Sequence, residues 1–280
     1  MFFCNILYLK GENINGDHMK ILITGACSGI GFLTGVTLAS RGHKVIMTTH
    51  TNKQIETLNI KLKKLNLDIQ TFKLDLNCSE DINKLKEVDI DILINHAGIG
   101  IGGSLIDLDI GEVRKNYEIN FFRSFELVKV FCKNLIRKKK SGKVIITSSI
   151  AGVIPFEFLG SYCSSKAAIT MMARCLRKEL KMIDSNIDVS VIEPGAYKTG
   201  FNKVMIDTVE ESISNKSSFY YKKKKILNIL KFKFNIIERR SLNTIVYQII
   251  KCVEDKDTKF IYSAPFFQSL MKKVYTILFY

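Results

Sequence analysis

Several features typical of secreted, metal-binding or membrane-spanning proteins are missing from this sequence. Its seven cysteines include no Cys-x-x-Cys pair and its four histidines are scattered, so neither a disulfide framework nor a metal site is expected. No apolar run is long enough to cross a bilayer as a helix. Repeats and linkers rich in proline, glycine or serine are also lacking. These absences favour one domain in a reducing cytosol.

Acidic residues are scarce as well. Asp and Glu number 27 against 42 Lys and Arg, which gives a formal net charge of +15. Nucleic-acid binding would require a basic stripe interleaved with aromatics, and attachment to a membrane surface would require a basic amphipathic helix. We interpret most of the lysines as solvated surface residues and expect no nucleic-acid partner. The segment after Tyr220, which is basic and aromatic, is a partial exception.

The first 18 residues do not have the pattern of a signal peptide. They have no basic n-region before their short apolar stretch and no small-residue cleavage site. The first strand pattern begins at Lys20, directly after Met19. We therefore expect residues 1–18 to be an extension outside the fold, and we hypothesise that Met19 is the native start.

Short apolar runs alternate with helix-length segments. The expected strands are residues 20–24, 44–49, 69–76, 91–95, 143–149, 188–194 and 259–264. Most are β-branched and almost continuously apolar, as in parallel strands covered on both faces. Helical segments such as 30–41, 54–65, 112–138 and 161–183 complete βαβ units. The pattern predicts an α/β fold, with one doubly wound domain, a seven-stranded, mainly parallel sheet and helices on both faces.

The alternation is interrupted between Gly200 and Arg240. Segments this long between a strand and the next are usually lids, binding elements or disordered. We predict a domain over residues 19–264, with 200–240 as its substrate lid or loop. Residues 265–280 are apolar with two lysines, and we expect them to form a C-terminal extension.

The first strand ends in TGACSGIG, Thr24 to Gly31. Glycines at this position let the backbone turn tightly and approach a pyrophosphate, while the N-terminus of the following helix attracts phosphate. A glycine pattern alone is a weak signal, and a ligand-free turn is the simpler interpretation. Its place between a strand and a helix favours nucleotide binding.

Tyr162 and Lys166 lie one turn apart within SYCSSK, so they share a face of a helix. An ammonium near a phenol favours phenolate, which predicts a tyrosine pKa below the usual value of about 10. Such a phenol can exchange a proton with an alcohol or carbonyl oxygen. Ser149 ends a strand thirteen residues earlier and can hydrogen-bond the same oxygen. Each residue taken alone would more often be structural.

Taken in order, these motifs resemble those of the short-chain dehydrogenases/reductases, in the branch with Thr-Gly-x-x-x-Gly-x-Gly and Tyr-x-x-x-Lys. The resemblance runs from about residue 20 to residue 199, with a looser match through the last strand. It implies a Rossmann fold and four catalytic residues, Asn120, Ser149, Tyr162 and Lys166. It also implies that Asn120 holds a water linking Lys166 to solvent, and that Lys166 binds the nicotinamide ribose.

The resemblance assigns cofactor contacts too. Asp75 matches the acidic residue that contacts adenine, and NHAG at 95–98 matches Asn-Asn-Ala-Gly, with His96 as a departure. EPGAYKT at 193–199 matches the turn and threonine that hold the nicotinamide amide. The cofactor-binding positions are thus expected to be Gly25, Ser28, Gly29, Ile30, Gly31, Thr49, His50, Asp75, Leu76, Asn95, Ala97, Gly98, Tyr162, Lys166, Pro194, Gly195 and Thr199.

The end of the second strand bears on the choice between NADP and NAD. Relatives that prefer NAD usually place an acid where Thr49 stands, to hold the ribose 2′-hydroxyl. Thr49 and His50 could instead accept a 2′-phosphate, with Lys53 nearby. Cys27 and Ser28, however, stand where many NADP relatives carry a basic residue. NADP(H) is favoured over NAD(H).

These observations predict an NAD(P)-dependent oxidoreductase that interconverts a secondary alcohol and a ketone, with Tyr162 as general acid/base. Relatives with apolar C-terminal extensions often act on lipid-like substrates, so we expect NADPH-dependent reduction of a hydrophobic carbonyl compound. One alternative is a 3-oxoacyl-[acyl-carrier-protein] reductase, whose acidic partner would suit a basic rim. Another is a non-catalytic dinucleotide-binding sensor, although such proteins usually lose the tyrosine or lysine.

The surroundings of the domain allow two interpretations. We expect a cytoplasmic protein with a small-molecule substrate and peripheral contact with a membrane through residues 221–240 or the C-terminus. Alternatively, these apolar residues pack over the core or form the interface of a homodimer or homotetramer. Charge and hydropathy weigh the two about equally.

Overall fold

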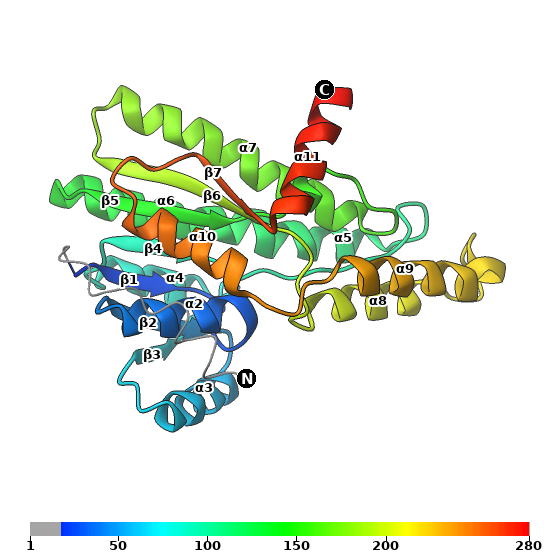
Figure 1. Ribbon diagram of the computed structural model, residues 1–280, viewed down its shortest axis with the longest axis horizontal. Helices are drawn as coiled ribbons and strands as arrows, with labels where there is room; N and C mark the ends of the chain where they lie inside the picture. Colours follow the sequence, from blue (N-terminus) through cyan, green and yellow to red (C-terminus); the bar gives the residue numbers. More distant parts are fainter. Residues whose placement is uncertain (1–17, 280) are drawn as a thin grey trace.

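The computed structural model describes residues 18–279 and contains a seven-stranded sheet in the order β3-β2-β1-β4-β5-β6-β7 (Figure 1). All six strand pairs are parallel, which confirms the doubly wound fold. The strands are β1 Lys20–Ile23, β2 Lys44–Thr49, β3 Gln70–Lys73, β4 Ile92–Asn95, β5 Gly142–Thr147, β6 Ile187–Pro194 and β7 Ile261–Ala264.

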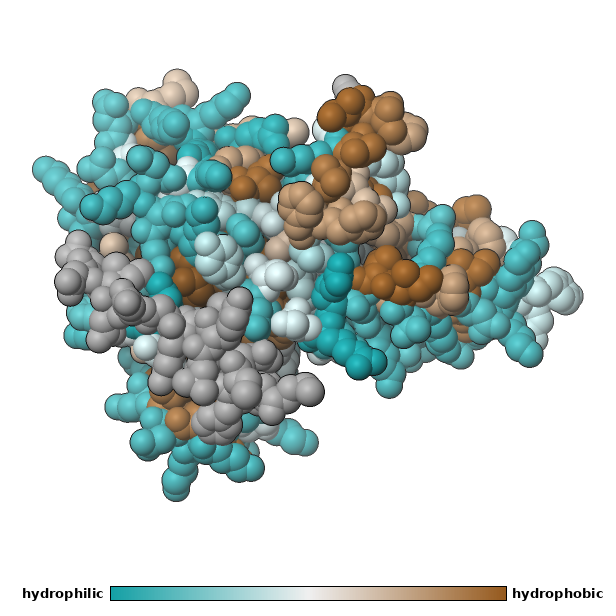
Figure 2. Space-filling view, in the orientation of Figure 1, coloured by the Kyte–Doolittle hydropathy of each residue, from teal (hydrophilic) through white to brown (hydrophobic). Residues whose placement is uncertain are grey.

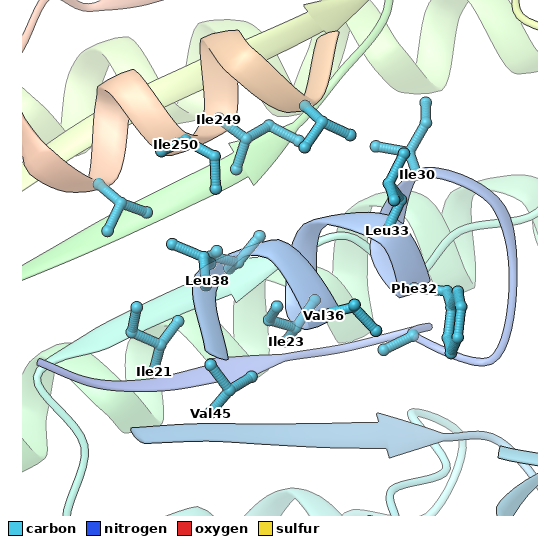
Figure 3. Close-up of a cluster of buried hydrophobic side chains, with 14 of the residues drawn as sticks. Ile21, Ile23, Ile30, Phe32, Leu33, Val36, Leu38, Val45, Ile249 and Ile250 are labelled. Carbon is cyan, nitrogen blue, oxygen red and sulfur yellow. The ribbon is translucent and has the colours of Figure 1, made fainter. Parts of the chain in front are cut away.

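Helices cover both faces of this sheet because successive strand residues point to opposite sides. Ile21 and Ile23 of β1 pack towards α2 and α10, as Figure 3 shows, whereas Leu22 packs with α6 and α7 on the other face. The helices of these two layers are α2 Gly29–Ser40, α3 Asn52–Lys64 and α10 Asn243–Glu254 on one face, and α4 Ser79–Asn83, α6 Ser124–Lys138 and α7 Gly160–Met182 on the other.

The segment predicted as one helix over 112–138 is divided. It consists of α5, Ile110–Tyr117, then a π-helical turn, Glu118–Arg123, and then α6. A π-turn adds a residue to the helical repeat and often marks a functional site. Here it contains Asn120, so the irregularity coincides with the predicted catalytic residue.

Residues 200–240 are helical rather than an irregular loop. Helices α8, Phe201–Ser212, and α9, Lys223–Ile237, lie together beyond the carboxyl ends of the strands (Figure 1). Their inner faces share an apolar cluster that includes Met205, Val209 and Leu230. This shared burial explains why a segment without obvious periodicity is ordered.

The C-terminal segment forms α11, Phe266–Phe279, which projects from the body of the protein (Figure 1). Its buried residues are polar, namely Gln268, Ser269 and Lys272. Its apolar residues face outwards, and Figure 2 shows hydrophobic side chains gathered over α11 and α9. Among residues 18–279, no helix is both long and apolar enough to cross a membrane.

The expected N-terminal extension falls almost entirely outside the described residues, which begin at His18. Met19 already belongs to the fold, because its carbonyl oxygen accepts the Lys44 N–H at 3.0 Å beside β2. Its own N–H donates to His43 Nδ1 at 3.3 Å. The ordered domain therefore includes the residue that precedes β1.

Candidate active site

The turn after β1 is built around two glycines and a threonine. Gly25 has φ +68° and Gly29 has φ +58°, conformations that favour glycine. A Cβ on Gly25 would lie only 2.9 Å from the Cα of Ala97. Thr24 Oγ1 accepts the N–H groups of His96 and Ala97, each at 2.9 Å. The threonine thus fixes the turns after β1 and β4 to one another.

This turn has the features that a pyrophosphate requires. Gly25 and Ser28 are exposed, and Ser28, the N-cap of α2, makes no side-chain cap bond. The first N–H groups of α2 directly follow the exposed Ser28, and a helix N-terminus attracts anions. The predicted contacts at Gly25, Ser28, Gly29, Ile30 and Gly31 come together here, and their arrangement fits a dinucleotide.

The ends of β2 and β3 bring the predicted adenosine contacts together. The exposed His50 Nδ1 lies 3.1 Å from Asp75 Oδ1. Thr49 is buried, and its hydroxyl donates to the carbonyl oxygen of Thr51 at 3.1 Å. Leu76 is also buried, so only its backbone can line the site. Among the predicted contacts at this end, the polar side chains that reach the surface are therefore those of His50 and Asp75.

The side chains of Asn95 and His96 form hydrogen bonds with other residues of the protein. Asn95 Nδ2 donates to Ser124 Oγ at 2.5 Å and to the Ser124 carbonyl oxygen at 3.2 Å, which ties β4 to α6. His96 Nδ1 lies 3.1 Å from Thr147 Oγ1. Burial, reinforced by the charge of Lys166, lowers the pKa of His96 to about 4. The imidazole is therefore neutral at physiological pH.

Ser149, Tyr162 and Lys166 meet at the carboxyl end of β5. The buried Tyr162 and Lys166 lie one turn apart on α7. Lys166 Nζ is 5.8 Å from the centre of the Tyr162 ring and donates to the Thr147 carbonyl oxygen at 3.0 Å. The Ser149 hydroxyl accepts the Ala151 N–H at 3.1 Å and lies close enough to the phenol to lower its pKa.

Burial controls the protonation of this pair. It raises the pKa of Tyr162 to about 12, an effect that the neighbouring Ser149 hydroxyl only partly opposes. It lowers the pKa of Lys166 to about 8. The predicted lowering of the tyrosine pKa is therefore wrong for this structure, because phenol desolvation dominates and the ammonium bonds to Thr147 instead. At neutral pH the pair is a phenol and an ammonium, both proton donors.

Asn120 is buried in the π-turn and pairs with a loop. Its carboxamide exchanges two hydrogen bonds with the backbone of Ile99, both at 2.9 Å, and donates to Ser165 Oγ at 3.1 Å. A Cβ on Gly98 would lie 3.0 Å from Asn120 Oδ1 and 3.4 Å from Lys166 Nζ. The predicted residues Asn120, Gly98 and Lys166 are thus adjacent.

The turn after β6 closes the other side of the crevice. Ser149 Oγ lies 3.5 Å from the Pro194 carbonyl oxygen, so Pro194 and Gly195 adjoin the Ser149–Tyr162 pair. A Cβ on Gly29 would lie 3.2 Å from two side-chain carbons of Thr199. The segment 193–199, predicted to hold the nicotinamide amide, therefore reaches back to the glycine turn after β1.

Two residues that sequence reasoning missed reach the site from distant helices. Lys61 of α3 donates from Nζ to the Cys27 carbonyl oxygen at 2.7 Å. Gln268 of α11 accepts the Ala196 N–H at 2.8 Å and donates to the Ile237 carbonyl oxygen at 2.7 Å. No local signal marks either one, since Lys61 is one of several lysines on α3 and Gln268 lies in an apolar segment.

The phenol of Tyr162 belongs to an apolar cluster formed largely by α8 and α9. The Phe201 ring of α8 lies 5.7 Å from the Tyr162 ring, centre to centre. The cluster around them includes Leu159, Met205, Ile206, Val209, Leu227 and Phe234. In the part of the chain that the structure describes, His, Cys, Asp and Glu form no group of three that could hold a metal ion.

Comparisons with known proteins agree with this geometry. The short chain dehydrogenase family model matches residues 19–210. A probable short-chain type dehydrogenase/reductase VdlC of Helicobacter pylori is 36% identical over 202 residues, covering 69% of this chain and 70% of that protein. An NADPH-dependent 1-acyldihydroxyacetone phosphate reductase of Schizosaccharomyces pombe is 30% identical over 216 residues, 74% of this chain and 69% of that one. A 3-ketodihydrosphingosine reductase of Bacteroides thetaiotaomicron is 34% identical over 181 residues, 65% of each chain.

Solved structures share the fold. A short-chain dehydrogenase/reductase from Burkholderia phymatum in complex with NAD has a TM-score of 0.74 at 18% identity, covering 88% of this chain and 89% of that one. A Burkholderia cenocepacia short-chain dehydrogenase in complex with NADP has a TM-score of 0.69 at 18% identity, covering 92% of each. With the family model and the relatives, the fold and the ordered motifs identify this chain as an oxidoreductase of the NAD(P)-binding short-chain dehydrogenase/reductase family.

Proposed function

We propose that this protein reduces a hydrophobic ketone to a secondary alcohol at the expense of NADPH. The observation that carries the proposal is the buried phenol of Tyr162, which is protonated at neutral pH, lies close to Ser149 and belongs to an apolar cluster. A protonated phenol can donate to a carbonyl oxygen, which is the proton transfer that reduction needs.

Each polar residue then has a separate task. Bound NADPH supplies the hydride that reduces the carbonyl carbon. Tyr162 donates its proton to the carbonyl oxygen, and Ser149 hydrogen-bonds the same oxygen as negative charge develops there. Lys166, an ammonium beside the ring, stabilises the tyrosinate left behind. Asn120 holds the loop at Ile99 against the helix that carries Tyr162.

The apolar cluster supports a lipid-like substrate. The α8 and α9 side chains in the cluster that contains Tyr162 are Phe, Met, Ile, Val and Leu, an apolar environment that favours an alkyl or acyl chain. Two relatives are named for reducing lipid-like carbonyl compounds, 1-acyldihydroxyacetone phosphate and 3-ketodihydrosphingosine. The substrate class we propose is therefore a long-chain keto compound.

The preference for NADPH rests on two basic side chains. His50 stands at the end of β2, where no acid is present to bind a ribose 2′-hydroxyl. Lys61 reaches the glycine turn, which has no basic side chain of its own, and its ammonium can pair with a 2′-phosphate. The relative from Schizosaccharomyces pombe is named as NADPH-dependent.

A panel of ketones assayed by NADPH absorbance tests the activity. We expect turnover of long-chain keto compounds, loss of roughly 10²–10⁴-fold in kcat for Tyr162→Phe, and wild-type activity for the control Tyr262→Phe, which lies in β7. Activity that survives in Tyr162→Phe contradicts the mechanism. A 3-oxoacyl group on acyl carrier protein belongs in the panel, because its turnover alone would favour the acyl-carrier-protein reductase.

A second assay tests the cofactor. Lys61→Ala should weaken binding of NADP⁺ while leaving binding of NAD⁺ unchanged, as measured by calorimetry. Lys63→Ala, a lysine on the same helix, is the matched control. If the two variants bind NADP⁺ equally well, Lys61 has no part in selecting the cofactor.

Contact with an anionic membrane surface completes the proposal. The residues of α11 with outward apolar side chains are Phe266, Phe267, Leu270, Met271, Val274, Ile277, Leu278 and Phe279. Next to it, a shallow groove of about 720 Å³ on α9 is lined by lysines and by Tyr221 and Phe232. Apolar side chains flanked by lysines are typical of segments that bind anionic lipid.

Co-sedimentation with vesicles tests this contact. Phosphatidylglycerol vesicles should retain the wild-type protein at low salt, phosphatidylcholine vesicles should not, and Phe267→Gln with Ile277→Gln should abolish binding. Light scattering on the same samples tests the alternative. A homodimer or homotetramer that these substitutions dissociate, without vesicle binding, would assign the α11 surface to self-association.

A further inference from the structure

Two asparagines one helical turn apart make the same set of contacts. Asn120 exchanges two hydrogen bonds with the backbone of Ile99, both at 2.9 Å. Asn116 repeats this with Ile101, accepting its N–H at 3.1 Å and donating to its carbonyl oxygen at 2.9 Å. Each carboxamide thus pairs with the loop after β4 as a neighbouring strand would.

The second hydrogen of each Nδ2 group points to a serine of α7. Asn116 donates to Ser161 Oγ at 2.8 Å, and Asn120 donates to Ser165 Oγ at 3.1 Å. These serines immediately precede Tyr162 and Lys166 in the chain. Both asparagines use every polar atom of the carboxamide, and Asn116 is 0% exposed.

The first turn of α7 is largely buried, but it lacks a side-chain cap. Its N-cap residue, Leu159, makes no side-chain cap bond. The first turn of a helix has free N–H groups and frays unless it is tied down. The bond from Asn116 to Ser161 supplies such a tie one residue before the phenol.

We propose that Asn116 is a positioning residue that sets the place of Tyr162 over the loop at 99–101. It does not touch the substrate, and it acts through Ser161. The loop to which Asn116 is hydrogen-bonded follows Gly98, which adjoins Lys166 Nζ. Without these hydrogen bonds the first turn of α7 can move away from the loop, and displacement of a reacting group by about 1 Å can cost about 10²-fold in rate. This role deepens the proposed reductase function and rests on it.

Asn116→Ala and Ser161→Ala test the role against matched controls. Asn134→Ala removes another buried asparagine, whose carboxamide accepts only the local bond from Arg137. Ser164→Ala removes a neighbouring hydroxyl that bonds only within α7. We expect Asn116→Ala to lower kcat by about 10- to 100-fold, with the Kd of NADPH within about 2-fold of wild type.

Three further readouts separate positioning from simple loss of stability. The pH profile of kcat should shift for Asn116→Ala and, to a smaller extent, for Ser161→Ala, but not for the controls. The double variant should be no slower than Asn116→Ala alone, because both changes break one contact. Ser161→Thr, which keeps the hydroxyl, should retain most of the activity that Ser161→Ala loses. Equal effects on kcat and an unchanged pH profile for Asn116→Ala and Asn134→Ala would overturn the proposal.

A measurement that does not depend on turnover tests the positioning role separately from the reductase function. In Asn116→Ala the amide of Ile101 should exchange hydrogen faster, and the ultraviolet titration of Tyr162, taken as the difference from Tyr162→Phe, should shift. If these changes appear in a protein that reduces no carbonyl compound, the reductase function fails while the positioning role holds. If neither change appears, the positioning role is refuted whatever the activity.

Discussion

His96 illustrates how a single side chain couples the candidate site to stability. Its imidazole lies between Thr147 and the Lys166 ammonium, and burial and that charge keep it neutral. The family resemblance places an asparagine at this position, which could bond to Thr147 without taking up a proton. The histidine therefore adds a sensitivity to acid that the asparagine would not have.

His96→Asn should make the protein more resistant to acid. The unfolded imidazole binds a proton below about pH 6.5, whereas the folded one does so only near pH 4. Wild-type stability is therefore lost as the pH falls through this window. Between pH 7 and pH 4.5, wild type should lose roughly 2 kcal/mol more of its free energy of unfolding than the variant does, as measured by urea unfolding. His50→Asn, at an exposed site, is the control, and equal pH dependence of wild type and His96→Asn would contradict this account.

Lys166→Met should lower the activity and raise the stability of the fold at neutral pH. Burial places the folded pKa at about 8, below the usual value of about 10.5, so a buried charge destabilises the fold at neutral pH. The unfolded chain binds the extra proton between these pH values, and wild-type stability rises with pH across that window. At pH 7 the variant should be more stable by roughly 1–3 kcal/mol, less what the lost Thr147 bond costs.

The difference in the free energy of unfolding between Lys166→Met and wild type should become smaller towards pH 10, because the wild-type lysine is neutral in the folded protein there. Denaturant titrations at the two pH values measure the difference, and the ketone assay measures the loss of turnover. A variant less stable than wild type at pH 7 and equally affected at pH 10 would show that the Thr147 bond outweighs the buried charge.

At the scale of whole elements, α11 is an apolar helix that is attached to the rest of the domain by polar contacts. Gln268 bridges Ala196, just after the Pro-Gly turn, and Ile237 at the end of α9. One turn later, Lys272 pairs with the buried Glu193 at the end of β6. A helix whose surface is apolar is thus connected to the strand that carries the predicted nicotinamide clamp.

Gln268→Ala should loosen this connection. The Ala196 N–H and the Ile237 carbonyl would lose their buried partner, which should lower the free energy of unfolding by roughly 2 kcal/mol. The KM for NADPH should rise more than kcat falls, because the turn is proposed to bind the cofactor and not the carbonyl group. Gln248→Ala on α10 is the control, and steady-state kinetics with thermal unfolding gives both quantities. An unchanged KM would show that α11 does not influence the turn.

For the whole molecule, binding of the cofactor should be visible as stability. The proposed site joins the turns after β1, β4 and β6, so a ligand across them binds the folded chain only. At a concentration 100 times its Kd, NADPH should stabilise the protein by about 2.7 kcal/mol. NADH at the same concentration should stabilise it less, because it lacks the phosphate that Lys61 and His50 would pair with. Equal shifts in Tm would refute the cofactor preference.

Much of this arrangement was predictable from local pattern. The strand runs, the glycine turn and the Tyr162–Lys166 spacing each depend on residues that are close in the chain, and the seven parallel strands are confirmed. The helical nature of residues 200–240 was missed because α8 and α9 are ordered by packing on each other. The π-turn at Asn120 was missed as well, because it arises where the helix meets the loop after β4.

The sequence by itself determined the family, the alternation of strands and helices, and the candidates for proton transfer, since these follow from residue type and short spacing. Tertiary structure decided the protonation states, because the extent of burial around Tyr162 and Lys166 depends on elements distant in the chain. It also brought Lys61 to the glycine turn, Gln268 to the turn after β6 and Asn116 to Ser161. These are contacts between helices and loops that no local pattern encodes, and they arise only when both faces of the sheet are covered.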